Sequence, residues 1–143
     1  MEENVSSSAE SGGVMKLDGF GIFVNDLAAQ IKFYKEVLGF EIKETAEDRN
    51  VYLEKDGTLF LMYGRRDFED MTNSKFGYAN GISGHFEIAL GVENYAAVDK
   101  NFAEVVAKGA KSIMPPTTMP WGQRTCYISD PEGNLIEIGS CVK

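Results

Sequence analysis

The feature of this 143-residue sequence that most constrains its fold is an internal repeat. Gly19–Val24 can be aligned with His85–Leu90, and Gly57–Met62 with Gly133–Ile138, and the elements expected between them follow the same order. Self-similarity at a spacing of roughly 66 residues indicates duplication of one supersecondary unit. Each unit has one helix to cover one face of its sheet, so the other face is free to meet its counterpart or a ligand.

The first copy has the pattern β-α-β-β-β. Alternating apolar residues predict a strand over Leu17–Val24, and Asn25 or Asp26 can cap a helix that Gly39 ends. The dipeptide Asp56-Gly57 between two apolar runs predicts a hairpin. The three strands expected after the helix are Phe40–Lys43, Asn50–Lys55 and Thr58–Tyr63.

The second copy repeats this order. Alternation resumes over His85–Leu90, and apolar residues at helical spacing predict a helix from Tyr95 to Lys108, closed by Gly109. Three further strands are expected at Lys111–Met114, Arg124–Ser129 and Leu135–Gly139.

The expected organisation is a flexible tail over residues 1–15 and one domain over residues 16–140. Its two repeats span 16–64 and 84–140, and residues 65–83, which lack apolar periodicity, join them as a linker or a lid over a binding site. The predicted fold class is α+β, with two βαβββ modules, mixed sheets and a cleft between the modules.

The composition limits the classes of molecule that the protein is expected to bind and the kinds of site that it can form. A formal net charge of −8 disfavours nucleic acid and anionic membrane surfaces but permits a neutral or cationic small ligand. Two cysteines cannot build a disulfide framework, and there is no apolar stretch long enough for a membrane helix, so we expect a cytoplasmic protein. A single histidine excludes any site that needs several histidines.

Three tracts carry a family resemblance: NDLAAQIKFYKEVLGF, GHFEIAL and PWGQRTCYISDPEGNLIEI. They resemble the glyoxalase/bleomycin-resistance/dioxygenase group, also called the vicinal oxygen chelate superfamily, and the resemblance covers Lys16 to Ser140. It implies paired βαβββ modules whose curved sheets form a cleft, and a homodimer.

The resemblance also implies where a metal would bind. In the metal enzymes of the family, four cleft-facing positions hold a divalent ion, and they fall here at Gly19, Leu61, His85 and Glu137. His85 and Glu137 match this pattern, whereas Gly19 and Leu61 offer no side-chain ligand. A catalytic ion usually needs three protein ligands, so no metal is assigned with His85 and Glu137 alone, although Zn, Ni, Mn or Fe could bind there. Glu87 or Tyr63 could supply a rearranged third ligand.

The two catalytic candidates each allow more than one role. His85 could be a metal ligand, a general base, a polar group that lines the site or a structural histidine. Glu137 could recognise charge or transfer a proton, or it could pair with Arg124 or another neighbour.

The remaining ligand-binding candidates indicate a largely apolar cleft. Gly19 and Gly21 suggest that a ligand or another backbone approaches closely, and Phe23 and Leu61 would supply apolar walls. Trp121 could stack on a planar or cationic ligand or cover the edge of the core. The full set of expected ligand-binding residues is Gly19, Gly21, Phe23, Leu61, Tyr63, His85, Glu87, Trp121 and Glu137.

These residues leave three functions open. The first is metal-independent binding of a small, partly apolar or aromatic molecule, as in the bleomycin-resistance branch. The second is a metal enzyme resembling lactoylglutathione lyase or an extradiol dioxygenase, with Glu137 as base or ligand and His85 beside it. The third is an interaction module without turnover of a small molecule.

Overall fold

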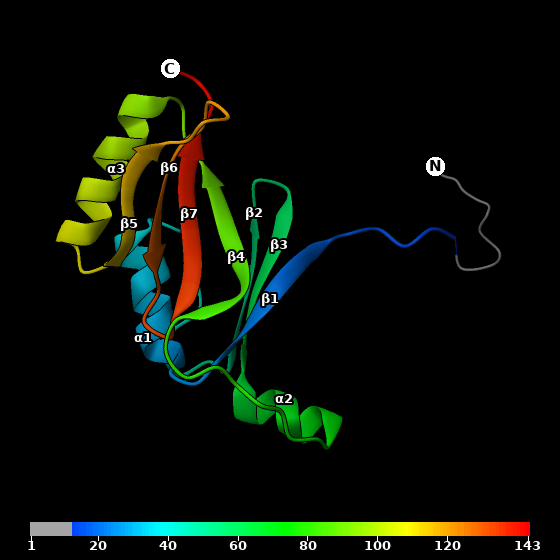
Figure 1. Cartoon of the computed structure of the whole chain (residues 1–143). Helices are drawn as coiled ribbons and strands as arrows, with labels where there is room; N and C mark the ends of the chain where they lie inside the picture. The colour runs from blue at the N-terminus through cyan, green and yellow to red at the C-terminus, as the bar shows by residue number, and fades with distance from the viewer. Residues whose placement is uncertain (1–12) are drawn as a thin grey trace.

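The computed structural model describes residues 13–143 (Figure 1). Residues 1–12 of the expected tail lie outside the described residues. Residues 13–15 have no regular secondary structure, and the side chains of Val14 and Met15 are 90% and 95% exposed.

The first module forms a three-stranded mixed sheet in the order β1-β3-β2. β1 (Gly19–Val24) runs parallel to β3 (Thr58–Gly64), and β2 (Asn50–Lys55) pairs with β3 as the predicted hairpin. Two helical segments connect β1 to β2: α1 (Leu27–Lys32) and the π-helical turn η2 (Phe33–Val37). Asp26 caps α1 by accepting a hydrogen bond from the Ala29 amide, as the sequence predicted.

The predicted strand at Phe40–Lys43 is wrong, because this segment has no regular secondary structure. Its apolar alternation reflects burial: Phe40 and Ile42 are 6% and 3% exposed. The Phe40 amide donates to the carbonyl of Tyr34 in η2. This amide therefore bonds back to the helix and does not pair with a strand.

The second module has the predicted βαβββ order and forms a four-stranded sheet, β4-β7-β6-β5. Its elements are β4 (Ser83–Gly91), α3 (Tyr95–Ala107), β5 (Lys111–Thr118), β6 (Arg124–Ser129) and β7 (Asn134–Ser140). Edge strand β5 extends beyond the predicted Met114, through Pro115 and Pro116. An edge strand tolerates proline because one side of its backbone makes no ladder bonds.

The connection between the modules contains a helix that the sequence pattern did not predict, α2 (Arg65–Thr72). None of its residues is buried, and its only apolar side chains are Phe68 and Met71, too few to indicate a helical period. Asn73 ends it in the left-handed conformation, with φ 51°. α2 projects away from the two sheets at one end of the molecule (Figure 1).

The buried side chains of both modules form one hydrophobic core. Ile22, Met62 and Tyr34 come from the first module, and Ile136 and Val98 from the second. Each of these side chains is at most 2% exposed. The modules therefore share one core.

The turn between β6 and β7 joins this core to the first helix. The carboxylate of Asp130, a residue that is 3% exposed, accepts hydrogen bonds from Gln30 Nε2 at 2.9 Å and from the Tyr34 hydroxyl at 2.8 Å. It also accepts from the amides of Glu132 and Asn134 and from the Asn134 side chain. One buried carboxylate thus fixes its own turn and ties it to α1 and η2.

Replacing Asp130 with Ala should lower the free energy of unfolding by about 3 kcal/mol, because Gln30 and Tyr34 would lose a charged acceptor inside the core. Asp130→Asn should cost less, since it keeps one carbonyl oxygen. Urea unfolding followed by circular dichroism measures both, and Asp18→Ala, at an exposed position, is the control. Equal stability of the Asp130 and Asp18 variants would contradict this prediction.

Candidate functional site

One face of the first sheet carries four of the expected ligand-binding residues. The ladder places Gly21 opposite Leu61 and Phe23 opposite Tyr63, so all four share a face. They are partly or fully exposed, whereas their neighbours on the other face are buried. The alternation in this part of the sequence therefore assigned these residues to the correct face of the sheet.

Gly19 lies on the same face, and glycine is required there because the neighbouring strand is so close. A Cβ atom at this position would overlap the carbonyl oxygen of Leu59 on β3, and at Gly21 it would lie 3.2 Å from Leu61 Cβ. Of the two explanations open from the sequence, close approach of another backbone accounts for Gly19.

The second sheet brings Glu87, Glu137 and Tyr127 together. Glu137 pairs with Ala89 on β4 and with Tyr127 on β6, while Glu87 lies two residues before Ala89 on the same face. The Tyr127 hydroxyl donates to Glu87 Oε1 at 2.9 Å, and the charge of Glu137 acts on the Glu87 carboxyl. Two neighbouring carboxyl groups repel each other when both are ionised.

The register corrects the alignment of the two repeats. Gly19 pairs with Leu59, and Leu135, the counterpart of Leu59, pairs with Glu87. The predicted equivalence of Gly19 with His85 is therefore wrong by two residues, because an irregularity between Ser83 and Glu87 shifts the register of β4. Glu87 is the residue that occupies the first-strand position of the second module.

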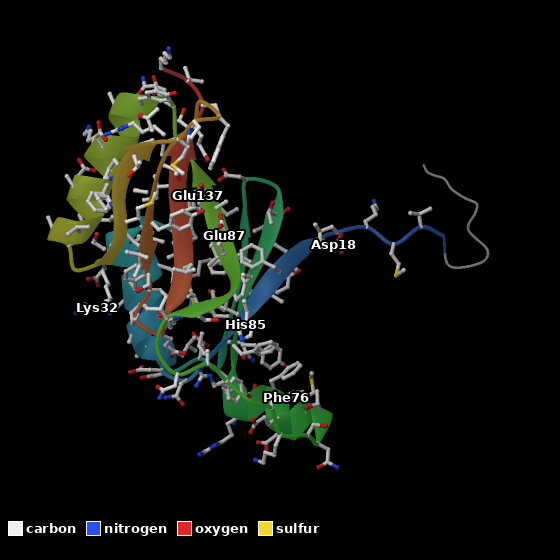
Figure 2. The ribbon with its side chains drawn as sticks, viewed as in Figure 1. Asp18, Lys32, Phe76, His85, Glu87 and Glu137 are labelled. Atoms are coloured by element: carbon white, nitrogen blue, oxygen red, sulfur yellow. The ribbon has the colours of Figure 1, made fainter. Side chains whose placement is uncertain are left out.

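His85 lies in this irregular part of β4. It is exposed, and its backbone amide donates to Ser83 Oγ at 3.4 Å. Figure 2 shows Glu87 and Glu137 close together on neighbouring strands, whereas His85 lies further along β4, nearer to Phe76.

Glu137 is held by uncharged donors. Its Oε2 accepts from Thr125 Oγ1 at 2.8 Å and from Gln123 Nε2 at 3.1 Å. The Trp121 indole, on a residue 68% exposed, donates to Gln123 Oε1 at 3.0 Å. A chain of hydrogen bonds therefore joins Trp121 to Glu137, a link that the sequence did not predict.

The ion pair considered for Glu137 is absent. Arg124 pairs with Asp99 at 2.8 Å, and within residues 13–143 neither Glu87 nor Glu137 forms a salt bridge. The negative charge of this pair is therefore not neutralised by a basic side chain of the described chain.

The surroundings perturb both Glu87 and Tyr127. Burial raises the pKa of Glu87, the hydrogen bond from Tyr127 lowers it, and the negative charge of Glu137 raises it further. Burial and then the hydrogen bond to Glu87 raise the pKa of Tyr127. The site thus disfavours ionisation of both side chains.

An aromatic cluster adjoins the first sheet. Phe23 and Tyr63 lie with ring centroids 4.5 Å and 5.2 Å from that of Phe68 on α2, and Phe76 lies 5.4 Å from Phe68. Phe23 and Phe76 are 41% and 45% exposed. Phe68 and Phe76 were missed because they belong to the segment without periodicity, where the only signal was its aromatic content.

Comparison with known proteins agrees with this architecture. The family model described as Glyoxalase/Bleomycin resistance protein/Dioxygenase superfamily matches residues 16–138. The chain belongs to this superfamily. The resemblance stated from the sequence and the α+β fold class of paired modules are therefore confirmed.

Similar proteins include an uncharacterized protein, YwbC, from Bacillus subtilis (strain 168), which is 32% identical over 127 residues, covering 85% of this chain and 94% of YwbC. A glyoxalase/bleomycin resistance protein/dioxygenase family enzyme from Burkholderia phytofirmans PsJN has a TM-score of 0.76 at 26% identity, covering 90% of this chain and all of the other. A lactoylglutathione lyase from Agrobacterium tumefaciens has a TM-score of 0.68 at 19% identity, with 90% and 93% coverage, and shows the shared fold alone.

Members of this superfamily often use a divalent metal, but the residues at the expected positions fit one poorly. Gly19 and Leu61 carry no donor atoms, and His85 lies away from the Glu87–Glu137 pair. Within the described residues, no group of three or more His, Cys, Asp or Glu side chains is placed to hold an ion. Two carboxylates without a third protein ligand are a weak ligand set for a resident catalytic metal.

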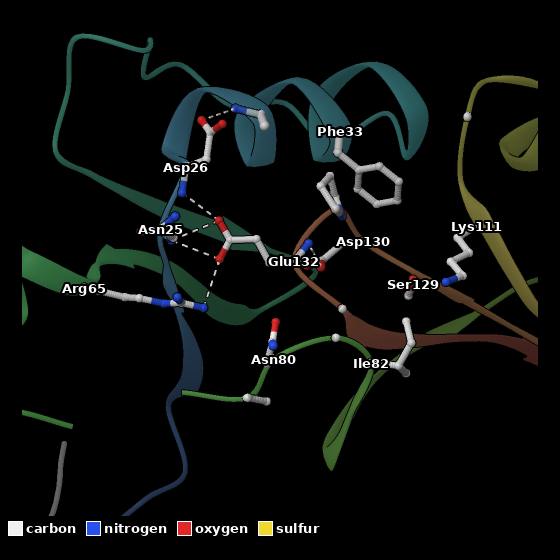
Figure 3. A pocket seen from close by; sticks show the side chains of 16 residues that line it. Asn25, Asp26, Phe33, Arg65, Asn80, Ile82, Lys111, Ser129, Asp130 and Glu132 are labelled. Atoms are coloured by element: carbon white, nitrogen blue, oxygen red, sulfur yellow. Dashed lines mark hydrogen bonds and ion pairs between the residues drawn. The ribbon is translucent and has the colours of Figure 1, made fainter. Parts of the chain in front are cut away.

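A cavity of about 650 Å³ also lies between the modules, near the turn that contains Asp130 (Figure 3). None of the expected ligand-binding residues lines it. Over residues 13–143, no helix has the length and apolar character needed to cross a membrane.

The raised pKa of Glu87 predicts a pH-dependent stability. The folded protein binds this proton more tightly than the unfolded chain, so the free energy of unfolding should fall as the pH rises from the ordinary value of 4.5 through the raised pKa. Glu87→Gln should remove this part of the slope, because the amide is neutral throughout and can still donate to Glu137.

Urea unfolding from pH 4 to pH 8 measures the difference between wild type and Glu87→Gln. The difference should change across this range, whereas the difference between wild type and Glu41→Gln, at an exposed position, should stay constant. A Glu87→Gln difference that does not vary with pH would contradict the raised pKa of Glu87.

Proposed function

We propose that this superfamily member binds a small molecule with a cationic group and an apolar or aromatic body, without a tightly bound metal. The observation that carries the proposal is the Glu87–Glu137 pair, which lies on an open sheet face and has no basic partner among the described residues. A bound ammonium group would relieve the repulsion between the two carboxylates.

Exposed aromatic side chains of both modules are available to the apolar part of such a ligand. Trp121 is exposed and linked through Gln123 to Glu137, and Phe23 and Phe76 are exposed on the side of the first module. Aromatic faces attract organic cations, and a site of this kind needs no metal. The net charge of −8 favours the same class of ligand.

Three further expectations from the sequence stay predictions: that the protein is a homodimer, that it is cytoplasmic, and that it binds its ligand without converting it. Enzymatic activity is a separate question, because the fold supports both binding proteins and enzymes.

Benzyltrimethylammonium is a suitable probe, with benzyl alcohol as the neutral aromatic control. Isothermal titration calorimetry should show saturable binding of the cation and none of the alcohol. Glu87→Gln and Glu137→Gln should each weaken binding about tenfold, because each removes a charge from the pair, while Glu41→Gln should leave it unchanged. Equal binding of the alcohol, or unchanged binding by both variants, would refute the proposal.

Cation binding should also strengthen as the pH rises through the raised pKa of Glu87, because the ligand competes with the proton on Glu87. Titrations at pH 5 and pH 7.5 test this. In Glu87→Gln the affinity should lose most of this dependence. The same affinity at both values in the wild type would show that the proton does not compete.

The metal-dependent alternative, in which His85 and Glu137 support lyase or dioxygenase chemistry, predicts a different result. Protein purified without chelator would hold about one Zn, Ni, Mn or Fe per chain after dialysis, and His85→Ala would lower that content. We expect metal well below one equivalent, and His85→Ala to bind benzyltrimethylammonium as the wild type does. Elemental analysis measures the metal content.

A further inference from the structure

The cavity of about 650 Å³ lies apart from the Glu87–Glu137 face and has the size of a small-molecule site. Both modules and the connection between them contribute to its wall (Figure 3). The first module supplies Phe33, the connection supplies Arg65, Asn80 and Ile82, and the second module supplies Ser129 and the turn that follows it.

Three carboxylates line this cavity, those of Asp26, Asp130 and Glu132, and each already accepts hydrogen bonds within the chain. Asp26 accepts from the Ala29 amide. Asp130 accepts five hydrogen bonds, as described above. Glu132 accepts from the backbone amides of Asn25 and Asp26 at 2.7 to 2.9 Å and from Arg65 Nη2 at 3.3 Å. The carboxylates of Asp130 and Glu132 hold the modules together and have little capacity left for a ligand.

Several donors at the same cavity are free. The Ser129 hydroxyl belongs to a residue that is 2% exposed, and it has no hydrogen-bond partner among the described residues. Arg65 Nε is also buried without a partner, although the guanidinium is fixed by stacking 4.3 Å from the centroid of the Tyr78 ring. Lys111 forms no salt bridge within residues 13–143, and Figure 3 shows its side chain next to Ser129.

Buried donors without partners are costly, and a ligand that accepts hydrogen bonds would satisfy them. The rest of the wall is apolar or small, with Phe33, Ile82, Ala29, Ala79 and Pro131. Arg65 and Lys111 add positive charge, and the two carboxylates of the turn are covered by their own donors. The ligand that complements this wall is a small anion with an apolar body.

We propose that this inter-module cavity is a second binding site that takes a small monocarboxylic acid, with its carboxylate beside Ser129 and Lys111 and its apolar body against Phe33 and Ile82. Arg65 Nε lies on the opposite side of the cavity and is available to a longer acid that carries a further oxygen. Because the lining comes from both modules, a bound acid would bridge them at the turn that already joins them.

Benzoate is the probe, and benzyl alcohol is its neutral match. In spectra of ¹⁵N-labelled protein, benzoate should produce saturable shifts of the amides of residues 80–82, 129, 130, 132 and 133, while benzyl alcohol should not. Lys111→Met should weaken benzoate binding about tenfold, because a charged contact is lost, and Lys100→Met, an exposed lysine on α3, should leave it unchanged.

The stability of Ser129→Ala tests whether the Ser129 hydroxyl lacks a hydrogen-bond partner in the unliganded protein. If the hydroxyl is unpaired, the variant should unfold at the same or a higher temperature in the absence of benzoate, and it should bind benzoate several-fold more weakly. Added salt should weaken wild-type binding.

Several results would overturn the proposal. They are equal effects of benzoate and benzyl alcohol, equal loss of affinity in Lys111→Met and Lys100→Met, and shifts confined to the amides around Glu87 and Glu137. Lower stability of Ser129→Ala together with unchanged benzoate affinity would also contradict it. The test is independent of the proposed cation site, since the probe, the charge and the substituted residues all differ.

Discussion

The rest of the structure depends on the buried carboxylate of Asp130. This side chain lies in a turn of the second module and accepts from Gln30 and Tyr34 in the first, at a point where the two modules share one core. Burial raises the pKa of the Tyr34 hydroxyl, and the nearby charge of Asp130 adds to the shift, so Tyr34 stays a donor. Glu132, two residues later, accepts the amides that precede α1 and fixes the start of that helix.

The second constraint is the pairing of strands. Because side chains alternate along a strand, the register decides whether a carboxyl group meets solvent, core or another carboxyl group. In β4, the irregularity before Glu87 places that residue beside Glu137 and leaves His85 in the irregular segment. β4 has nine residues, and this shift in its register puts Glu87, and not His85, next to Glu137.

Much of the fold follows from local patterns, and less of the site does. The caps, the hairpin at Asp56-Gly57 and the second module were predictable because each depends on residues close in sequence. The segment Phe40–Lys43 was not, because burial produces the same apolar alternation in a loop as in a strand. The Glu87–Tyr127 contact depends on three paired strands, and a repeat alignment cannot detect a register shift in one of them.

The functional assignment finally depends on how hydrogen-bond donors are distributed among the carboxylates. The chain has 22 acidic residues, but Asp130 and Glu132 are surrounded by amide, hydroxyl and guanidinium donors and act in structure. Glu87 and Glu137 have no basic partner among the described residues, and the raised pKa of Glu87 reflects its burial and the charge beside it, so this pair is where we place the proposed cation. Near the turn, the carboxylates already accept from other groups, and Ser129 Oγ and Arg65 Nε have no hydrogen-bond partner among the described residues. One acidic chain can therefore offer one site for a cation and another for an anion.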